Sequence, residues 1–159
     1  MRLFGDEIKE LSLAETVSRV GFVFQDADSQ LFSPTVEDEV AFGPENLCLP
    51  REEIGKRISA ALKAVGMEEL RFSRVQELSG GQKQLTALAS VLAMRPKALI
   101  FDEPMSMLDG ESRRLVLDAV RAQKEQKKAV LIVEHDVEAL SLADRTYVME
   151  NGGVREASL

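Results

Sequence analysis

Two short apolar runs constrain the fold of this 159-residue chain more than any other feature of its sequence. Residues 98–101 and 129–133 are almost unbroken in apolar character and are too short to be helices. Such runs are typical of strands that are covered on both faces, as in parallel sheets. Residues 111–126, which lie between the two runs, have the pattern of a helix. Strands that alternate with helices predict an α/β fold with a parallel sheet.

Other segments predict the elements around this unit. Residues 19–24 form a β-branched and aromatic run that predicts a strand. Residues 35–42 predict a short helix with Thr35 as its N-cap, ended by Gly43 and Pro44. Three more helices are expected at residues 51–65, 80–92 and 136–143, and two more strands are expected at residues 145–149 and from 153 onward.

The predicted elements divide the chain into two kinds of structure. Residues 34–79 are expected to be all-helical, whereas residues 1–33 and 80–159 have the α/β pattern. No linker or internal repeat separates the two kinds of segment. A single domain over residues 1–159 with an inserted helical subdomain is therefore expected.

Composition and charge limit the function classes. The formal charge of −7 lacks the broad positive field of nonspecific nucleic-acid binding, so no nucleic-acid partner is expected. The single cysteine, Cys48, cannot form an internal disulfide, and no stretch approaches the roughly 20 apolar residues that span a bilayer. Residues 1–7 lack the apolar core of a signal peptide. A location in the cytosol is expected.

A glycine-rich string opens one of the predicted helices. Residues 78–82 read Leu-Ser-Gly-Gly-Gln, and Ser79, Gly80, Gly81 and Gln82 lie where backbone N–H groups are free and the helix dipole favours an anion. These residues form a candidate phosphate-binding site. A serine N-cap preceded by an ordinary turn explains the same string equally well.

Two carboxylates follow the first apolar run. Asp102 and Glu103 stand at the carboxyl end of the predicted strand, where α/β sheets place their ligand sites. Asp102 suits an oxygen-preferring metal such as Mg²⁺, which leaves Glu103 to orient or deprotonate water. His135, the only histidine, follows the second run and is expected near this pair. Taken alone, the Asp102–Glu103 string is also explained by an ordinary acidic turn after a strand, and His135 by a structural histidine.

In this order and spacing, the strings resemble the ATP-binding cassette (ABC) family from about residue 3 to about residue 154. Gln25 is similar to the family's glutamine at the strand end that touches Mg²⁺ or water. Residues 106–109, Ser-Met-Leu-Asp, are similar to the loop whose aspartate, here Asp109, crosses a dimer interface. The resemblance implies a P-loop NTPase fold with a RecA-like parallel sheet and an inserted helical subdomain.

The resemblance also implies a role for each residue in ATP hydrolysis. Asp102 and Gln25 would hold Mg²⁺, and Glu103 would polarise the attacking water. His135 would sense the γ-phosphate. In a head-to-tail dimer with a second ATPase subunit, the 78–82 string would contact the ATP held by that subunit. The implied contacts are Ser79, Gly80, Gly81, Gln82 and Asp109.

Within the family, residues 28–32 and 40–47 resemble the ATPases of energy-coupling factor importers for vitamins and for cobalt or nickel. This implies an ATP-hydrolysing subunit at the cytoplasmic face of the cell membrane, bound to a transmembrane coupling subunit and a substrate-binding membrane subunit. Related DNA-repair and chromosome ATPases insert coiled coils or zinc modules before the Leu-Ser-Gly-Gly-Gln string, which this chain lacks. Gln84 departs from the family, whose members usually have an arginine after the string.

No Gly-x-x-x-x-Gly-Lys-Ser/Thr string occurs, so the loop that holds the β- and γ-phosphates is missing. Relatives carry it upstream of the segment that residues 3–13 resemble, which implies an N-terminally truncated domain. A degenerate or split ATPase that only donates its signature is the alternative. The missing strand would lie between the strand before His135 and the strand around Tyr147, and its loss would leave two apolar edges unpaired.

The chain alone is expected to bind ATP weakly or not at all, because it lacks the lysine and amides of that loop. It is also expected to be poorly soluble or to depend on a complementing partner. Calorimetric titration with ATP measures the affinity. A micromolar dissociation constant for the isolated chain would contradict this prediction.

Overall fold

The computed structural model describes residues 2–106, 108–135 and 137–157. At its centre lies a parallel three-stranded sheet in the order β3 (Val20–Val23), β4 (Ala98–Asp102) and β5 (Ala129–Val133). Helix α5 (Gly110–Glu125) connects β4 to β5. The α/β unit predicted from the two apolar runs is therefore confirmed.

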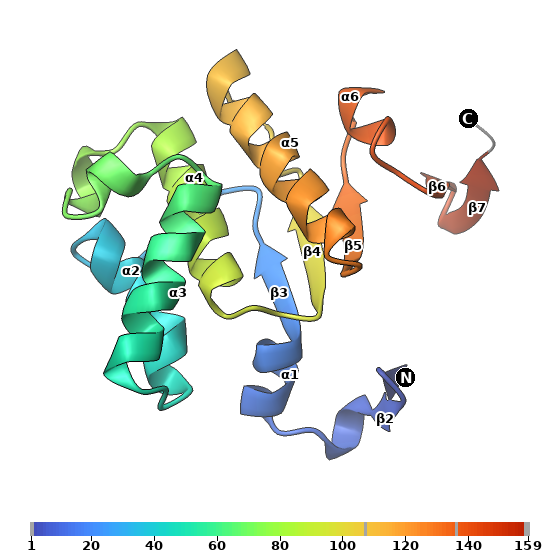
Figure 1. Ribbon diagram of the computed structural model, residues 1–159. Helices are drawn as coiled ribbons and strands as arrows, with labels where there is room; N and C mark the ends of the chain where they lie inside the picture. Colours follow the sequence, from blue (N-terminus) through green and yellow to red (C-terminus); the bar gives the residue numbers. More distant parts are fainter. Residues whose placement is uncertain (1, 107, 136, 158–159) are drawn as a thin grey trace.

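Three helices pack into a group beside the sheet (Figure 1). These are α2 (Val36–Asn46), α3 (Arg51–Ala64) and α4 (Gly80–Ala93), with short 3₁₀ turns at Glu68–Leu70 and Val75–Glu77. Helix α4 also contacts α5 and β3, so it joins the helical group to the sheet. The core runs through this junction, and its largest fully buried side chains include Phe101, Leu62, Leu88 and Leu99.

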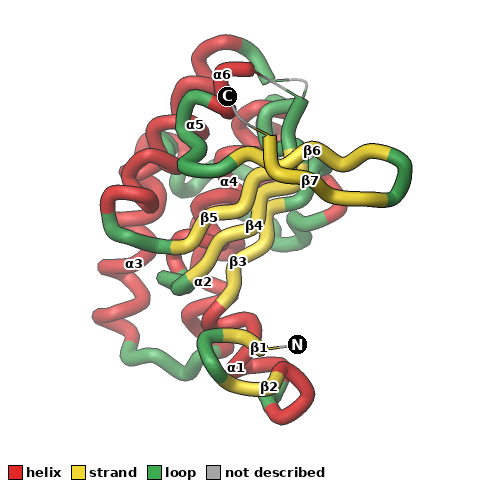
Figure 2. Tube along the Cα trace, turned by 90° about the vertical axis from the view of Figure 1, so that its right-hand side faces the viewer, coloured by secondary structure: helices red, strands yellow, loops and turns green. Residues whose placement is uncertain are grey.

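In the described part of the chain, helices cover one face of the sheet and leave the other uncovered, and Figure 2 shows this open face. Along β5, half-buried Val130 and Ile132 alternate with exposed residues, of which Leu131 is 55% and Val133 47% exposed. The prediction that this strand is covered on both faces is therefore wrong. The open face carries apolar instead of polar residues, so the sequence of β5 lacks the alternation that marks a half-covered strand.

The sheet has an unpaired edge at β5. Among the described residues, β5 pairs only with β4, and β6 (Thr146–Glu150) pairs only with β7 (Gly153–Ala157). The β6–β7 hairpin extends away from the helical group (Figure 1). The unpaired edge expected for the strand before His135 is thus present in this part of the chain.

Helix α2 continues past the residues expected to end it. Gly43 and Pro44 lie within the helix, which ends at Asn46. Pro44 is in the last turn, where its missing N–H removes a single helical hydrogen bond. The Asn46 side chain donates to the Phe42 carbonyl at 3.0 Å, and Leu47 N–H donates to the Gly43 carbonyl at 3.2 Å. These bonds close the helix beyond the proline.

The N-terminal segment contains elements that were not predicted. It forms a small hairpin, β1 (Arg2–Leu3) with β2 (Asp6–Glu7), a 3₁₀ turn at Ile8–Glu10, and helix α1 (Leu13–Arg19). Near the other end, α6 (Val137–Leu140) is shorter than expected, and its expected first residue, Asp136, lies outside the described residues. None of the described helices is long and apolar enough to cross a bilayer.

Candidate functional site

Strand β4 ends at Asp102, and Glu103, the second predicted carboxylate, follows it directly. The Glu103 N–H donates to the Val133 carbonyl at 2.9 Å, so the bonding to β5 continues one residue past the strand. Glu103 has a φ of +43°, in the left-handed region that non-glycine residues seldom adopt. Such a backbone costs about 1–3 kcal/mol and is concentrated at functional sites.

The Glu103 carboxylate connects the ends of three neighbouring strands. Its Oε2 accepts from Gln25 Nε2 at 2.8 Å, just after β3, and its Oε1 lies 3.0 Å from His135 Nε2, just after β5. The contact is a hydrogen bond from His135 to the carboxylate in the tautomer that carries the proton on Nε2. The His135 side chain is 84% exposed and Glu103 is 27% exposed, which leaves the site open to a ligand. The expected proximity of His135 to the acidic pair is confirmed.

Glu134 fixes the loops on either side of this group, a role that the sequence did not reveal. Its Oε1 accepts from the Met105 N–H at 3.1 Å, and its Oε2 accepts from the His135 N–H at 3.0 Å. One side chain therefore holds the segment after β4 against the segment after β5. Its place next to the only histidine is the single sequence signal that could have drawn attention to it.

Ser79 and Gln82 bond to each other at the start of α4. Ser79 Oγ accepts from the Gln82 N–H at 3.2 Å, and Gln82 Oε1 accepts from the Ser79 N–H at 2.9 Å. This capping box confirms the serine N-cap that was one of the two interpretations. It leaves the first amides of the helix, those of Gly80 and Gly81, at an exposed N-terminus that favours an anion.

Gly81 packs closely against the start of α5. A Cβ atom built on Gly81 would clash with Ser112 Oγ and lie 3.9 Å from Asp109 Oδ2, so a side chain there would require Ser112 to shift. Asp109 caps α5 by accepting from the Ser112 N–H at 2.7 Å, and the Ser112 hydrogen bonds lower the pKa of this carboxyl group. The structure thus brings Asp109 next to the 78–82 string. Met107, within the predicted 106–109 loop, lies outside the described residues.

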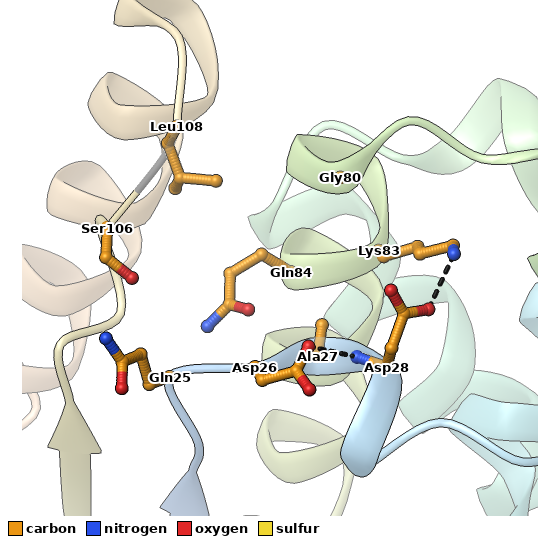
Figure 3. A pocket seen from close by; sticks show the side chains of 9 residues that line it. All are labelled: Gln25, Asp26, Ala27, Asp28, Gly80, Lys83, Gln84, Ser106 and Leu108. Atoms are coloured by element: carbon orange, nitrogen blue, oxygen red, sulfur yellow. Dashed lines mark hydrogen bonds and ion pairs between the residues drawn. The ribbon is translucent and has the colours of Figure 1, made fainter.

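A cleft of about 350 Å³ connects the two groups of residues (Figure 3). Gln25, Gly80 and Ser106 line it together with side chains that sequence reasoning did not assign. The buried Gln84 donates from Nε2 to the Phe24 carbonyl at 2.9 Å. Lys83 forms an ion pair with Asp28 at 2.6 Å, so two bonds tie the first turns of α4 to the loop that carries Gln25. The departure of Gln84 from the family pattern is the sequence feature that could have pointed to its place in this cleft.

The predicted metal ligands form only part of a coordination shell. Among the described residues, no group of three or more His, Cys, Asp or Glu side chains could hold a metal ion. Mg²⁺ in nucleotide sites typically uses one or two carboxylates and takes its remaining ligands from water and phosphates. Asp102 ends the middle strand next to Glu103, and Gln25 donates to Glu103 through its nitrogen, so that bond does not use its amide oxygen. The residues present fit a Mg²⁺ ion that arrives with a nucleotide.

A parallel sheet with Gln25, Glu103 and His135 at three strand ends, beside a glycine-rich helix start, is typical of α/β domains that bind a ligand at the carboxyl ends of their strands. Comparison with known proteins identifies the family. The family model described as ABC transporter matches residues 1–106. The chain belongs to the ABC transporter family.

Individual relatives are similar along nearly the whole chain. A putative ABC transporter ATP-binding protein of Methanosarcina acetivorans is 49% identical over 97% of this chain, which spans 24% of that protein. The energy-coupling factor transporter ATP-binding protein EcfA of the same organism is 47% identical over 85% of this chain, which spans 49% of that protein. This chain therefore spans at most about half the length of these two relatives.

Two solved structures share the fold. CbiO1 from Clostridium perfringens, described as part of the ABC transporter complex cbiONQ, has a TM-score of 0.83 and 37% identity, with 97% of this chain and 63% of that chain covered. The ATP-binding cassette MJ0796, solved as a dimer bound to ADP and Pi, has a TM-score of 0.84 and 26% identity, with 98% and 71% covered. The expected α/β fold with a helical subdomain is confirmed.

Proposed function

We propose that this chain is part of an ATP-hydrolysing subunit that powers transmembrane import by an energy-coupling factor type transporter. The observation that carries the proposal is the Glu103 carboxylate bonded to Gln25 and His135 at three adjacent strand ends. Similarity to EcfA and to CbiO1 supports the importer type. The proposed location is the cytoplasmic face of the membrane.

The proposed chemistry gives each of these side chains a role. Glu103 accepts a proton from, or orients, the water that attacks the γ-phosphate. Gln25 and His135 hold the Glu103 carboxylate between them and are placed to respond to the γ-phosphate and its metal. A Mg²⁺ ion held by Asp102 and Gln25 would neutralise charge on the phosphates. Ser79, Gly80, Gly81 and Gln82 would bind the ATP of a second subunit, and Asp109 would contact that subunit.

The helical region is the proposed contact with the membrane subunits. We place its boundaries at residues 34 and 79, although α4 packs against α2 and α3 as well as against the sheet. Phe42 in this region and Phe32 just before it form an edge-to-face pair with ring centroids 4.6 Å apart, and the two residues are 46% and 65% exposed. Exposed aromatic pairs of this kind are typical of protein interfaces, and this supports docking of the coupling subunit here.

Replacing Glu103 with glutamine tests the proposed chemistry. In this chain joined to the P-loop segment of an energy-coupling factor relative, Glu103→Gln is expected to lower kcat about a hundredfold, because the amide cannot accept the proton. The KM for ATP should change by less than about twofold, since the lost interaction acts in the transition state. Steady-state ATPase assays measure both values.

The matched control is Glu125→Gln, the same substitution on the exposed surface of α5. It should leave kcat unchanged. Equal turnover of the Glu103→Gln protein and the unchanged protein would refute hydrolysis at this site.

A second function is supported by the glycine amides at the exposed, capped start of α4, which favour an anion. In this alternative, the chain holds no nucleotide and lends its 78–82 string to the ATP bound by a partner. Glu103→Gln would then have no effect on the partner's turnover, whereas changes at Ser79 would.

A further inference from the structure

A second cleft lies at the far end of α4 from Ser79. Its volume is about 340 Å³, and α3 and the C-terminal ends of α4 and α5 enclose it. Helix α4 has 14 residues, which separates the two sites by about 20 Å at 1.5 Å per residue. Three cationic side chains line this cleft: Arg57, Arg95 and Lys128. None of them belongs to the proposed ATPase site.

The positive charges of the cleft exceed the negative charges that the structure supplies. One carboxylate oxygen, Glu53 Oε1, accepts from both Arg57 Nε and Arg95 Nη1, each at 2.9 Å. Lys128 Nζ donates to a neutral amide, Gln123 Oε1, at 2.7 Å. Three cations therefore share the single charge of Glu53, an excess of two positive charges (3 − 1 = 2) in a chain whose net charge is −7.

Only one of the three cations has a clear role in the fold. Arg57 Nη1 lies 3.3 Å from the carbonyl oxygens of Ala93 and Met94, where it caps the C-terminus of α4. Among the described residues, the hydrogen bonds of the Arg95 and Lys128 side chains go to the Glu53 carboxylate and the Gln123 amide and not to a helix-terminal carbonyl group. Burial, followed by the positive charge of Arg95, lowers the pKa of Lys128. A bound anion would offset the repulsion between Lys128 and Arg95, so this end of the cleft would stabilise one.

We propose that this cleft binds a dianionic phosphate group carried by a small molecule. Two unbalanced cations match the charge of a phosphate monoester near neutral pH. Guanidinium and ammonium groups make strong, charge-assisted hydrogen bonds to phosphate oxygens. The volume is at the lower end of the range for small-molecule sites, and the floor formed by Ala60, Ala61 and Ala64 leaves room for an apolar group.

Calorimetric titration of the chain with phenyl phosphate, at constant ionic strength, tests the proposal. The unchanged protein should bind one equivalent, and inorganic phosphate should bind to the same site more weakly because it lacks the apolar group. The double variant Arg95→Gln, Lys128→Gln should raise the dissociation constant at least tenfold. Lys128→Arg, which keeps the charge, should retain binding.

Two matched controls separate this site from other positive regions. Lys63→Gln removes an exposed lysine of α3 that does not line the cleft, and it should leave binding unchanged. Ser79→Arg should also leave it unchanged, because the start of α4 is not involved. Absence of binding at about 10 mM ligand, a concentration well above the dissociation constants of typical specific sites, would overturn the proposal. Binding that the double variant retains and that Ser79→Arg removes would also overturn it.

The double variant is not expected to fail through misfolding. Glutamine is shorter than arginine and lysine but keeps their β- and γ-methylene groups and a polar end, and removing like charges relieves their repulsion. Its urea midpoint should equal or exceed that of the unchanged protein. If the midpoint falls, the single variant Lys128→Gln provides the comparison, and it too must bind phenyl phosphate more weakly.

Discussion

Ser79→Arg is expected to lower ATP turnover about a thousandfold when the chain is mixed with an ABC ATPase subunit that carries its own P-loop. This factor is close to the upper end of the effect of removing one anion-binding group from an active site. Ser79 caps α4 at the glycine amides, and its side chain is part of the proposed contact with the partner's ATP. Arginine would remove the capping hydroxyl and fill the space before those amides. A coupled-enzyme assay of phosphate release measures the turnover.

The same assay decides between the two proposed functions. Ser59→Arg, an identical substitution on the exposed surface of α3, should leave turnover unaffected. If Ser79→Arg lowers turnover and Glu103→Gln does not, the chain acts only on the partner's nucleotide. Full turnover by the Ser79→Arg mixture would contradict the role of the 78–82 string altogether.

Phe101→Ala is expected to lower the free energy of unfolding by about 4 kcal/mol, the usual cost of truncating a fully buried phenylalanine. Phe101 lies on the middle strand and has no exposed surface. One face of the sheet has no helical cover, so the covered face carries much of the core. Domains have total free energies of unfolding of about 5–15 kcal/mol, so this substitution would remove a large share of the stability.

Urea denaturation followed by circular dichroism measures this loss. The control is Phe72→Ala, at a side chain that is 75% exposed and contacts Arg71 at 5.4 Å from its ring centroid. That change should cost less than about 1 kcal/mol, the value of an exposed cation–π contact. Similar urea midpoints for the two variants would show that the sheet is not the centre of the fold.

Local sequence patterns predicted the elements that depend on neighbouring residues. Short apolar runs predicted strands β4 and β5, and the serine N-cap predicted the start of α4. The end of α3 was predicted from Gly66, which has a φ of +67° in the structure. Helix α1 was missed although Ser12 and Glu15 form a capping box, because the helix has only one turn or two and buries none of its residues. Weak burial leaves weak periodicity.

Features that depend on distant segments could not be predicted from the sequence alone. The exposed face of β5 reflects which elements lie beside it, and the run of residues 129–133 is apolar on both sides. The same holds for Glu134 and Gln84, whose hydrogen bonds join segments 29 and 60 residues apart in sequence. The approach of Gln25, Glu103 and His135 was predictable because parallel strands bring their carboxyl ends to one edge.

The close packing of Gly81 against Ser112 has an evolutionary consequence. The second glycine of the 78–82 string lies so close to Ser112 that an added Cβ atom would clash with the serine side chain, a constraint within this chain in addition to any contact with a nucleotide. Selection for folding alone would then retain it, even in a lineage that had lost ATP hydrolysis. Preservation of this glycine is therefore poor proof of an active enzyme, and covariation between positions 81 and 112 would reveal which constraint has maintained it.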